Sequence, residues 1–495
     1  MLMPEPDAGV IARRTEIIRE LKRIVPGEGV IAEQEALRAY ECDGLTAYHQ
    51  LPLIVVLPET VDQISRVLRY CKAHGVKIVP RGAGTSLSGG ALPLADGITL
   101  GLGKFNRIIE IDYPNRCIVA QPGVTNLAIT RAVEEDGFYY APDPSSQIAC
   151  TIGGNVAENS GGVHCLKYGL TTNNLLGLEI VTMDGEIIRL GGKHLDSGGY
   201  DLMGIVTGSE GLLGVITEVT VRILTKQPSA RALLIGFGSS EAAGACVTAI
   251  IAAGIIPGGM EMMDRAAIHA VEDFVHAGYP LDVEAILIVE LDGPEVEVDF
   301  LVGRVGEIAT DNGAVSVRAS ESEAQRLLFW AGRKAAFPAV GRISPDYYCM
   351  DGTIPRHRLP EVLSRISEAS QRYGLAVANV FHAGDGNLHP LILYDANKAG
   401  DLEKAEEFGA EILKVCVEVG GVLTGEHGVG VEKRDLMGIM FSEDDLKQQQ
   451  RLKCAFDPAL LLNPGKVFPT LHRCAELGRV HIHGGETRFP DLPRF

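Results

Sequence analysis

Apolar residues recur with two different periods along the chain. Near the N-terminus, Ile17, Leu21 and Ile24 follow helical spacing, which predicts a helix over residues 15–24. From Pro52 onward, short β-branched runs alternate with a second helical stretch over residues 62–74. The strands predicted in this part of the chain cover residues 53–57, 77–80, 98–102, 108–112, 117–121, 178–183 and 215–224.

The second half of the chain has the same alternation, after a short polar segment at 225–230 that we interpret as a linker. Strand-like apolar runs cover residues 233–237, 285–290 and 376–381, and a helical pattern covers residues 402–419. The chain is therefore expected to be an α+β protein with a domain boundary near residue 228.

Composition adds one unusual feature, the glycine content. Glycine accounts for 58 of the 495 residues, about 12% against a typical value of roughly 7%. Hydrophobic residues make up 46% of the chain, which excludes a disordered or collagen-like protein. The net charge of −19 gives no general attraction to nucleic acid or to anionic lipid, so no nucleic-acid partner is expected.

Targeting and redox signals point to the cytoplasm. The first 20 residues contain no continuous apolar segment, and no run of 18 apolar residues occurs anywhere. The ten cysteines include no C-x-x-C pair, which favours free thiols and argues against an iron–sulfur cluster within this chain. We expect a cytoplasmic protein that contacts the inner face of the membrane only peripherally, through partners.

Three glycine clusters occur at 80–90, 152–162 and 207–217; the first follows a predicted strand and the third leads into one. The first fails the dinucleotide fingerprint because Leu87 replaces a glycine, and it fails the nucleotide P-loop because Gly90 replaces a lysine. Each cluster alone is compatible with a structural turn. Three in one unit favour an extended ligand with a pyrophosphate, such as FAD.

A second constellation has the residue types of a metal site. His382 and His389 flank an Asp-Gly pair; a two-residue hairpin turn centred on residues 385–386 would place them opposite each other, with Cβ atoms roughly 5 Å apart. Glu426 and His427 are adjacent in a glycine-rich loop. Two histidines and a carboxylate can hold a catalytic divalent ion, and zinc, manganese and iron all accept this set. The alternatives are structural histidines or a zinc hydrolase, although no H-E-x-x-H helix is present.

The glycine clusters and residues 140–146 together resemble the FAD-binding domain of the vanillyl-alcohol-oxidase superfamily. The resemblance implies an α+β fold, with a two-subdomain FAD-binding domain of the PCMH type and a C-terminal α/β cap domain with an antiparallel sheet. The implied boundaries are a helical lead-in at 1–50, the FAD-binding domain at 51–228, the substrate or cap domain at 229–440, a return segment to the flavin domain at 441–470 and a tail at 471–495.

The same resemblance implies FAD bound without a covalent link, because the first loop holds Thr85 and Ser86 and no histidine. The residues that it implies for FAD binding are Pro80, Arg81, Gly82, Ala83, Gly84, Thr85, Ser86, Gly89, Pro142, Ser146, Thr151, Gly153, Gly154, Asn155, Ala157, Asn159, Gly161, Glu210, Gly211, Gly214, Ile216 and Asn463.

The second half resembles the D-2-hydroxy-acid dehydrogenase branch of that superfamily. This implies His382, His389 and Glu426 as metal ligands, usually for zinc, and His427 as the active-site base. It also implies that Arg333, in the segment Trp-Ala-Gly-Arg-Lys, binds the substrate carboxylate.

Further segments resemble the FAD-linked catalytic subunits of bacterial glycolate oxidases (glycolate dehydrogenases). They are residues 40–44, 145–150, 162–167, 337–352 and 469–476. The resemblance implies oxidation of glycolate to glyoxylate, with D-lactate as a further substrate. It also implies electron transfer to a second flavin-type subunit and an iron–sulfur subunit, and then to quinone. The alternatives are a stand-alone dehydrogenase for D-lactate or another D-2-hydroxy acid, a zinc hydrolase and a non-catalytic flavin-binding subunit.

Overall fold

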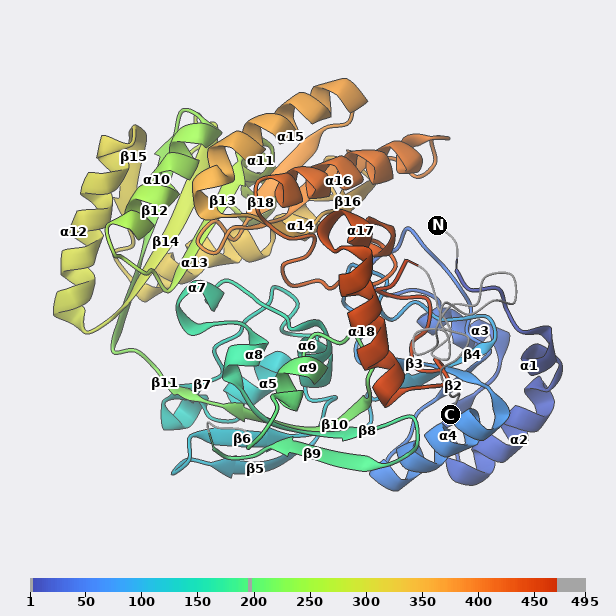
Figure 1. Cartoon of the computed structure of the whole chain (residues 1–495). Coiled ribbons are helices and arrows are strands. Elements are labelled where there is room, and N and C mark those ends of the chain that lie inside the picture. The colour runs from blue at the N-terminus through green and yellow to red at the C-terminus, as the bar shows by residue number, and fades with distance from the viewer. Residues whose placement is uncertain (1–2, 195–197, 470–495) are drawn as a thin grey trace, which may run out of the picture.

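A computed structural model describes residues 3–194 and 198–469. In Figure 1 the N-terminal half forms the lower part of the molecule and residues from about 229 onward form the upper part, with α18 (Glu443–Phe456) running down between them. We call these parts the flavin domain and the cap. The tail predicted at 471–495 lies outside the described residues.

The first sheet of the flavin domain has four strands. Its order is β1 (Val30–Ile31), β2 (Ile54–Val56), β4 (Gly97–Gly101) and β3 (Lys77–Arg81). The last three are parallel, and β1 pairs antiparallel with β2. Helices α2 (Arg14–Ile24) and α4 (Val61–His74) share one core with the sheet. The lead-in is thus not purely helical, because it supplies β1, which is too short to show a period.

The second sheet of the flavin domain is antiparallel throughout. Its order is β5 (Ile108–Asp112), β6 (Cys117–Ala120), β10 (Val215–Arg222), β8 (Leu175–Val181) and β9 (Ile187–Gly191). Helix α6 (Ile152–Glu158) packs over β10 and places the second glycine cluster above this sheet. The smaller elements around it are α5 (Asn126–Arg131), β7 (Phe138–Tyr139), α7 (Cys165–Tyr168), α8 (Thr171–Asn174) and α9 (Leu202–Val206).

The cap contains an antiparallel sheet of seven strands. Their order is β15 (Ala314–Ala319), β12 (Ser229–Phe237), β14 (Ala285–Gly293), β13 (Gly259–Asp264), β18 (Val377–Phe381), β20 (Pro390–Tyr394) and β16 (Asp346–Cys349). Beside it, β17 (Gly352–Thr353) pairs with β19 (Asn387–Leu388).

Helices cover the cap sheet on both faces. Leu233 and Ile235 of β12 belong to the core formed with α10 (Ser240–Ala252), α12 (Glu295–Asp311), α15 (Leu359–Tyr373) and α16 (Asp401–Glu418). Leu234, between them, points to the opposite core with α11 (Arg265–Val275), α13 (Glu323–Lys334) and α14 (Ala336–Val340). Burial on both faces explains why these strands have continuous apolar runs rather than alternation.

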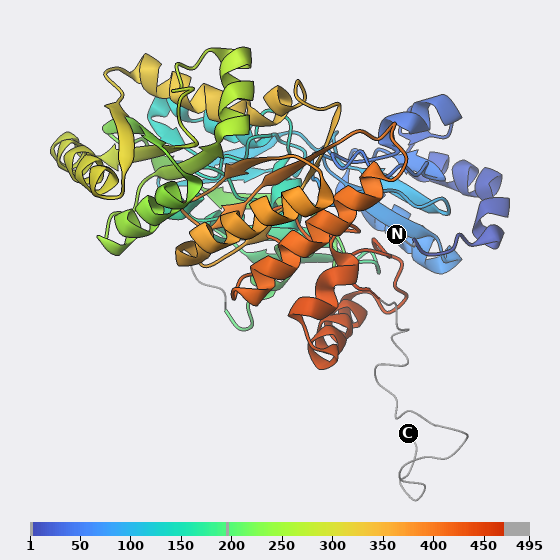
Figure 2. The same ribbon diagram turned by 90° about the horizontal axis from the view of Figure 1, so that it is seen from above.

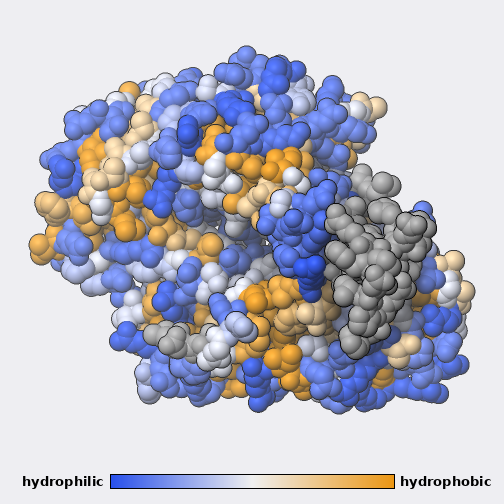
Figure 3. All heavy atoms as spheres, in the orientation of Figure 1, coloured by the Kyte–Doolittle hydropathy of each residue, from blue (hydrophilic) through white to orange (hydrophobic). Residues whose placement is uncertain are grey.

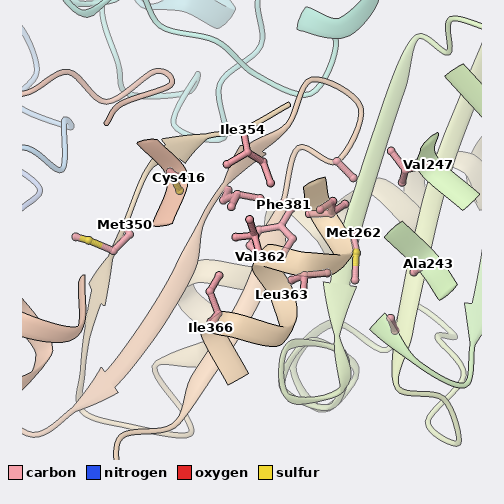
Figure 4. Packing of buried hydrophobic residues seen from close by; sticks show 14 of the residues in the cluster. Ala243, Val247, Met262, Met350, Ile354, Val362, Leu363, Ile366, Phe381 and Cys416 are labelled. Atoms are coloured by element: carbon pink, nitrogen blue, oxygen red, sulfur yellow. The ribbon is translucent and has the colours of Figure 1, made fainter. Parts of the chain in front are cut away.

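The first of these cores is the larger. Figure 4 shows Val362, Leu363 and Ile366 of α15 directed toward Phe381 of β18 and Met262 of β13. In Figure 2, α15 and α16 lie side by side over this core. The two strands that carry the candidate metal ligands are therefore backed by a closely packed layer.

At the other end of the cap sheet, β15 is an edge strand. Val315 and Val317 of β15 are exposed, as are Val296 and Phe300 of α12. On the face shown in Figure 3, hydrophobic residues gather at the left side, over this end of the cap.

The connections between the two domains differ from the predicted linker. Strand β11 (Leu224–Thr225) pairs with β7, and β12 begins at Ser229, so only three residues of the predicted 225–230 linker lie between strands.

After α18, the chain meets the first sheet again. Leu462 pairs in parallel with Ile78, and the Asn463 N–H donates to the Ile78 carbonyl at 2.7 Å.

His164 of the flavin domain forms a partly buried ionic contact with the cap. Its Nδ1 lies 3.0 Å from Asp143 Oδ2, and its Nε2 lies 3.1 Å from Glu290 Oε1 in β14. Arg326 and the Trp330 indole of α13 also bind Glu290. Burial lowers the pKa of His164, but the two carboxylates outweigh burial and raise this pKa to about 10. The contact is therefore ionic at neutral pH.

Replacing His164 tests how much this contact holds the domains together. Because the folded-state pKa exceeds the unfolded value of about 6.5, the stabilisation is complete below about pH 6.5 and is lost as pH rises through about 10. We expect His164→Gln to lower the Tm by several degrees near pH 6 and the difference from wild type to shrink toward pH 10, as measured by scanning calorimetry. The matched control is His357→Gln, at an exposed position. A Tm difference that is constant with pH would contradict the ionic contact.

Candidate active site

A cavity of about 490 Å³ lies between the flavin domain and the cap, within the size range of ligand pockets. Its wall brings together loops from both domains. The predicted FAD-binding residues that line it are Pro80, Arg81, Gly82, Ala83, Gly84, Thr85, Ser86, Ser146, Thr151, Gly153, Gly154, Asn155, Ala157, Glu210, Gly211, Gly214 and Ile216. All five predicted catalytic and metal-binding residues, Arg333, His382, His389, Glu426 and His427, line the same cavity.

Five predicted FAD-binding residues do not line the cavity: Gly89, Pro142, Asn159, Gly161 and Asn463. Several of them support its wall instead. The Pro142 carbonyl accepts from the Asn126 amide, and Asn159 Oδ1 accepts from the backbone N–H of Thr172. The Asn463 amide donates to the Gly90 carbonyl at 3.0 Å. The sequence resemblance does not distinguish residues that contact the ligand from residues that support the wall, because both kinds are needed to give the wall its shape.

Thr151 and Asn155 are among the polar side chains of the cavity wall that form no hydrogen bond with any residue the structure describes. Thr151 Oγ1 and both side-chain polar atoms of Asn155 are buried and unpaired. A Cβ at Gly82 would lie 2.5 Å from Thr151 Oγ1, so the first glycine loop passes directly against this residue. Buried polar groups are seldom left unpaired. Thr151 and Asn155 therefore fit a wall that hydrogen-bonds a polar cofactor.

The hairpin that carries the two histidines has a register different from the predicted one. Asn379 pairs with Pro390 and His382 with Asn387, so the predicted pairing of His382 with His389 is wrong by two residues. The loop is longer than the predicted Asp-Gly turn, because Gly386, at φ +86°, donates its N–H to the His382 carbonyl at 3.1 Å. A shift of two residues keeps both histidines on one face, with ring centroids 5.0 Å apart.

The candidate metal ligands converge although the register differs. Glu426 Oε1 lies 3.2 Å from His382 Nε2 and 3.4 Å from His389 Nε2. One ligand atom from each of the three residues lies within 4.8 Å of the others. Within residues 3–194 and 198–469, the ring nitrogens of the buried His389 form no hydrogen bond of good geometry, and Nε2 lies 3.5 Å from Asp351 Oδ1 as well as 3.4 Å from Glu426 Oε1. This donor set fits a divalent ion that leaves one coordination position open.

Glu261 supports the candidate metal ligand His382, and the sequence analysis missed it. His382 Nδ1 lies 2.7 Å from Glu261 Oε1, so the proton on Nδ1 faces the carboxylate and Nε2 is turned toward Glu426. Glu261 Oε2 accepts from Arg333 Nε at 2.8 Å. The signal for Glu261 was a single carboxylate within the apolar run of β13, where buried charges need partners.

Arg333 is held in α13 with its guanidinium directed into the cavity wall. The side chain is 1% exposed, and Glu261 Oε2 lies 2.7 Å from its Nη2. No residue in the described part of the chain hydrogen-bonds Nη1. A guanidinium with a free Nη beside a cavity is suited to a ligand carboxylate.

His427 lies over the metal-type cluster. Its ring stacks on His389 with centroids 4.9 Å apart and planes 3° apart, and none of the described residues hydrogen-bonds its Nδ1. Burial, aided by His389 and Lys433, lowers the pKa of His427 to about 4 against the opposing carboxylates of Asp351 and Glu426. The imidazole is therefore neutral near pH 7 and able to accept a proton.

Asp351, which the sequence analysis also missed, orders the loop that carries Glu426 and His427. It accepts the backbone N–H groups of Gly425 at 3.0 Å, Glu426 at 3.1 Å and His427 at 2.9 Å. Its charge is balanced by Lys433 Nζ at 3.1 Å. No motif marks Asp351, because its bonds go to backbone atoms more than 70 residues away.

Comparisons with known proteins identify two family matches in this chain. Residues 52–191 match an FAD binding domain, and residues 226–467 match the C-terminal domain of FAD linked oxidases. The glycolate oxidase subunit GlcD of Escherichia coli (strain K12) is 58% identical over 482 residues, or 97% of each chain. A D-lactate dehydrogenase of Anaerostipes hadrus is 29% identical over 462 residues, covering 91% of this chain and 97% of that protein.

The solved structure of p-cresol methylhydroxylase with substrate bound has a TM-score of 0.79 at 16% identity, covering 94% of this chain and 98% of that one. This likeness confirms the expected PCMH-type fold and concerns the fold alone. Family membership rests on the sequence identity, which extends over nearly the whole chain. The chain therefore belongs to the family of FAD-linked oxidoreductases that includes the glycolate oxidase subunit GlcD.

Proposed function

We propose that this protein oxidises glycolate to glyoxylate with non-covalently bound FAD as the electron acceptor. The observation that carries the proposal is the single cavity wall that holds a partly unpaired guanidinium, a neutral imidazole and a His₂–carboxylate cluster. The printed name of the E. coli relative, a glycolate oxidase subunit, supports the choice of substrate.

Each polar group of the wall has a separate task. Arg333 holds the substrate carboxylate through its free Nη1. His427 takes the proton of the substrate hydroxyl, since its lowered pKa keeps it unprotonated near pH 7. Glu261 orients both Arg333 and His382, so the carboxylate anchor and the hydroxyl site keep a fixed separation.

The bound groups supply the rest of the chemistry. His382, His389 and Glu426 would hold a divalent ion, proposed to be zinc, which would supply a Lewis acid that lowers the pKa of the substrate hydroxyl. The first and second glycine loops would hold FAD, which would supply the hydride acceptor.

A D-2-hydroxy acid with a side chain, such as D-lactate, is the second candidate substrate. It is favoured by the relationship to a D-lactate dehydrogenase and differs from glycolate by one methyl group. Phe337 lines the cavity with its ring centroid 6.1 Å from that of His389, and it restricts the space for larger side chains. A zinc hydrolase is disfavoured, because it leaves the FAD binding domain without a role.

The reduced flavin must pass its electrons to a further acceptor. The printed name of the E. coli relative calls it a subunit, which supports an acceptor within a multi-subunit complex. We propose a second flavin-type subunit and an iron–sulfur subunit as partners, with membrane contact on the cytoplasmic side through them. In the described part of the chain, no helix has both the length and the apolar character needed to cross a bilayer.

Arg333→Gln tests the carboxylate anchor. Losing a buried charge-assisted bond costs at least about 2 kcal/mol, so kcat/KM for glycolate should fall by roughly 30-fold or more, mostly through a higher KM. Steady-state kinetics with an artificial dye acceptor measure this. The matched control is Arg326→Gln, which removes a guanidinium of the same helix that does not line the cavity. Unchanged glycolate kinetics in Arg333→Gln would rule out the assignment.

His389→Asn tests the metal site. Because His389 supplies one of three ligands, the variant should lose most of its bound metal, as measured by elemental analysis, together with glycolate oxidation. Its flavin absorbance should persist, since the glycine loops are untouched. A variant that keeps full metal content would contradict the ligand set.

His427→Asn separates the base from the metal. We expect kcat to fall by about 10²- to 10⁴-fold with metal and FAD contents unchanged, because His427 acts on the substrate proton alone. The test is to measure kcat and metal content on the same preparation. Loss of metal in His427→Asn would instead make His427 a ligand.

A further inference from the structure

Glu210, in the third glycine cluster, has an uncommon backbone conformation. Its φ is +51°, in the left-handed region that side-chain-bearing residues seldom adopt, and it is 6% exposed. A residue held in this region and buried with a charge must be fixed by strong contacts. The contacts of Glu210 indicate the role of its side chain.

Both carboxylate oxygens of Glu210 bind the cap. Oε1 accepts the N–H of Val429 at 2.7 Å, and Oε2 accepts the N–H of Gly430 at 2.7 Å. On the other side, the Glu210 carbonyl accepts from the Asn463 side-chain amide at 2.6 Å, which fixes the backbone of Glu210 in the flavin domain. The carboxylate therefore joins the flavin domain to residues 429–430 through two short bonds.

Residues 429–430 end the loop that carries Glu426 and His427. Asp351 of the cap holds the beginning of that loop, at Gly425, Glu426 and His427. Between the two anchors, Gly428 has φ +85°, and a Cβ there would meet Glu158 Oε2 first and would lie 3.0 Å from the Glu210 carboxyl carbon. The loop therefore rests against the carboxylates of Glu158 and Glu210, and it is Glu210 that accepts its backbone N–H groups at residues 429–430.

We propose that Glu210 is a positioning residue: it fastens the loop of Glu426 and His427 to the flavin domain and thereby sets the distance between these groups and the flavin site. The family resemblance had placed Glu210 among the FAD contacts; in this proposal its charge serves the metal-bearing loop instead. The proposal rests on the proposed function only for the roles of Glu426 and His427.

Glu210→Gln is the test, because the amide keeps the shape of the side chain but can accept at only one of its two ends. Its NH₂ group would face a backbone N–H, donor against donor. We expect FAD content to stay as in wild type, metal content to fall, and kcat for glycolate to fall by roughly 10- to 100-fold with little change in KM. Hydrogen exchange of the peptide spanning residues 425–431 should become faster.

Two variants serve as controls. Glu179→Gln alters another buried glutamate of the flavin domain that does not line the cavity, and it should change neither metal content nor exchange of residues 425–431. Glu210→Asp keeps the charge but shortens the reach. If Glu210→Gln does not fold, Glu210→Asp carries the test, with the same loss of metal and the same faster exchange expected.

The outcomes separate this proposal from the proposed function. Loss of FAD with metal and loop exchange unchanged would make Glu210 a flavin contact and overturn the proposal. Unchanged metal, exchange and kcat would also overturn it. If wild-type protein does not oxidise glycolate but Glu210→Gln still loses metal and exchanges faster at residues 425–431, the positioning role stands and the proposed substrate is wrong.

Discussion

The largely buried carboxylate of Glu426 makes the interactions on which the site depends. An unpaired buried carboxylate is strongly unfavourable, so its charge must be matched when the chain folds. His382 and His389 from the cap hairpin lie beside one of its oxygens, and the Gly161 N–H of the flavin domain donates to the other at 2.9 Å. The hairpin, the loop of Glu426 and the second glycine cluster therefore have to be placed together, and the cavity is formed where they meet.

Local patterns predicted most of the regular structure. The strand expected at residues 108–112 coincides with β5, and the helix expected at 402–419 differs from α16 by one residue at each end. The predictions were wrong where contacts between distant parts of the chain determine the local structure. Strand β1 has only two residues and exists because β2 pairs with it. The hairpin register depended on a backbone bond closed by Gly386, which the Asp-Gly signal did not specify.

Only the part of the candidate site that lies in recognisable motifs could be predicted from the sequence. The glycine clusters and the four residues His382, His389, Glu426 and His427 are recognisable because several chemically suited residues are close in sequence. Glu261 and Asp351 were missed because each is a single acidic residue whose partners are distant along the chain. For Glu210 the sequence placed the residue in the right region, but only the structure shows that its oxygens bind backbone amides of the cap.

In the proposed function, one cavity holds both a metal-assisted hydroxy-acid site and the flavin, and anaerobic reduction of the bound flavin tests this arrangement most directly. Glycolate should bleach the visible flavin absorbance of metal-loaded protein in a single rapid phase, without any partner subunit. Protein stripped of metal by a chelator should keep its flavin but be reduced far more slowly. No bleaching by glycolate, or bleaching at the same rate with and without metal, would contradict the account.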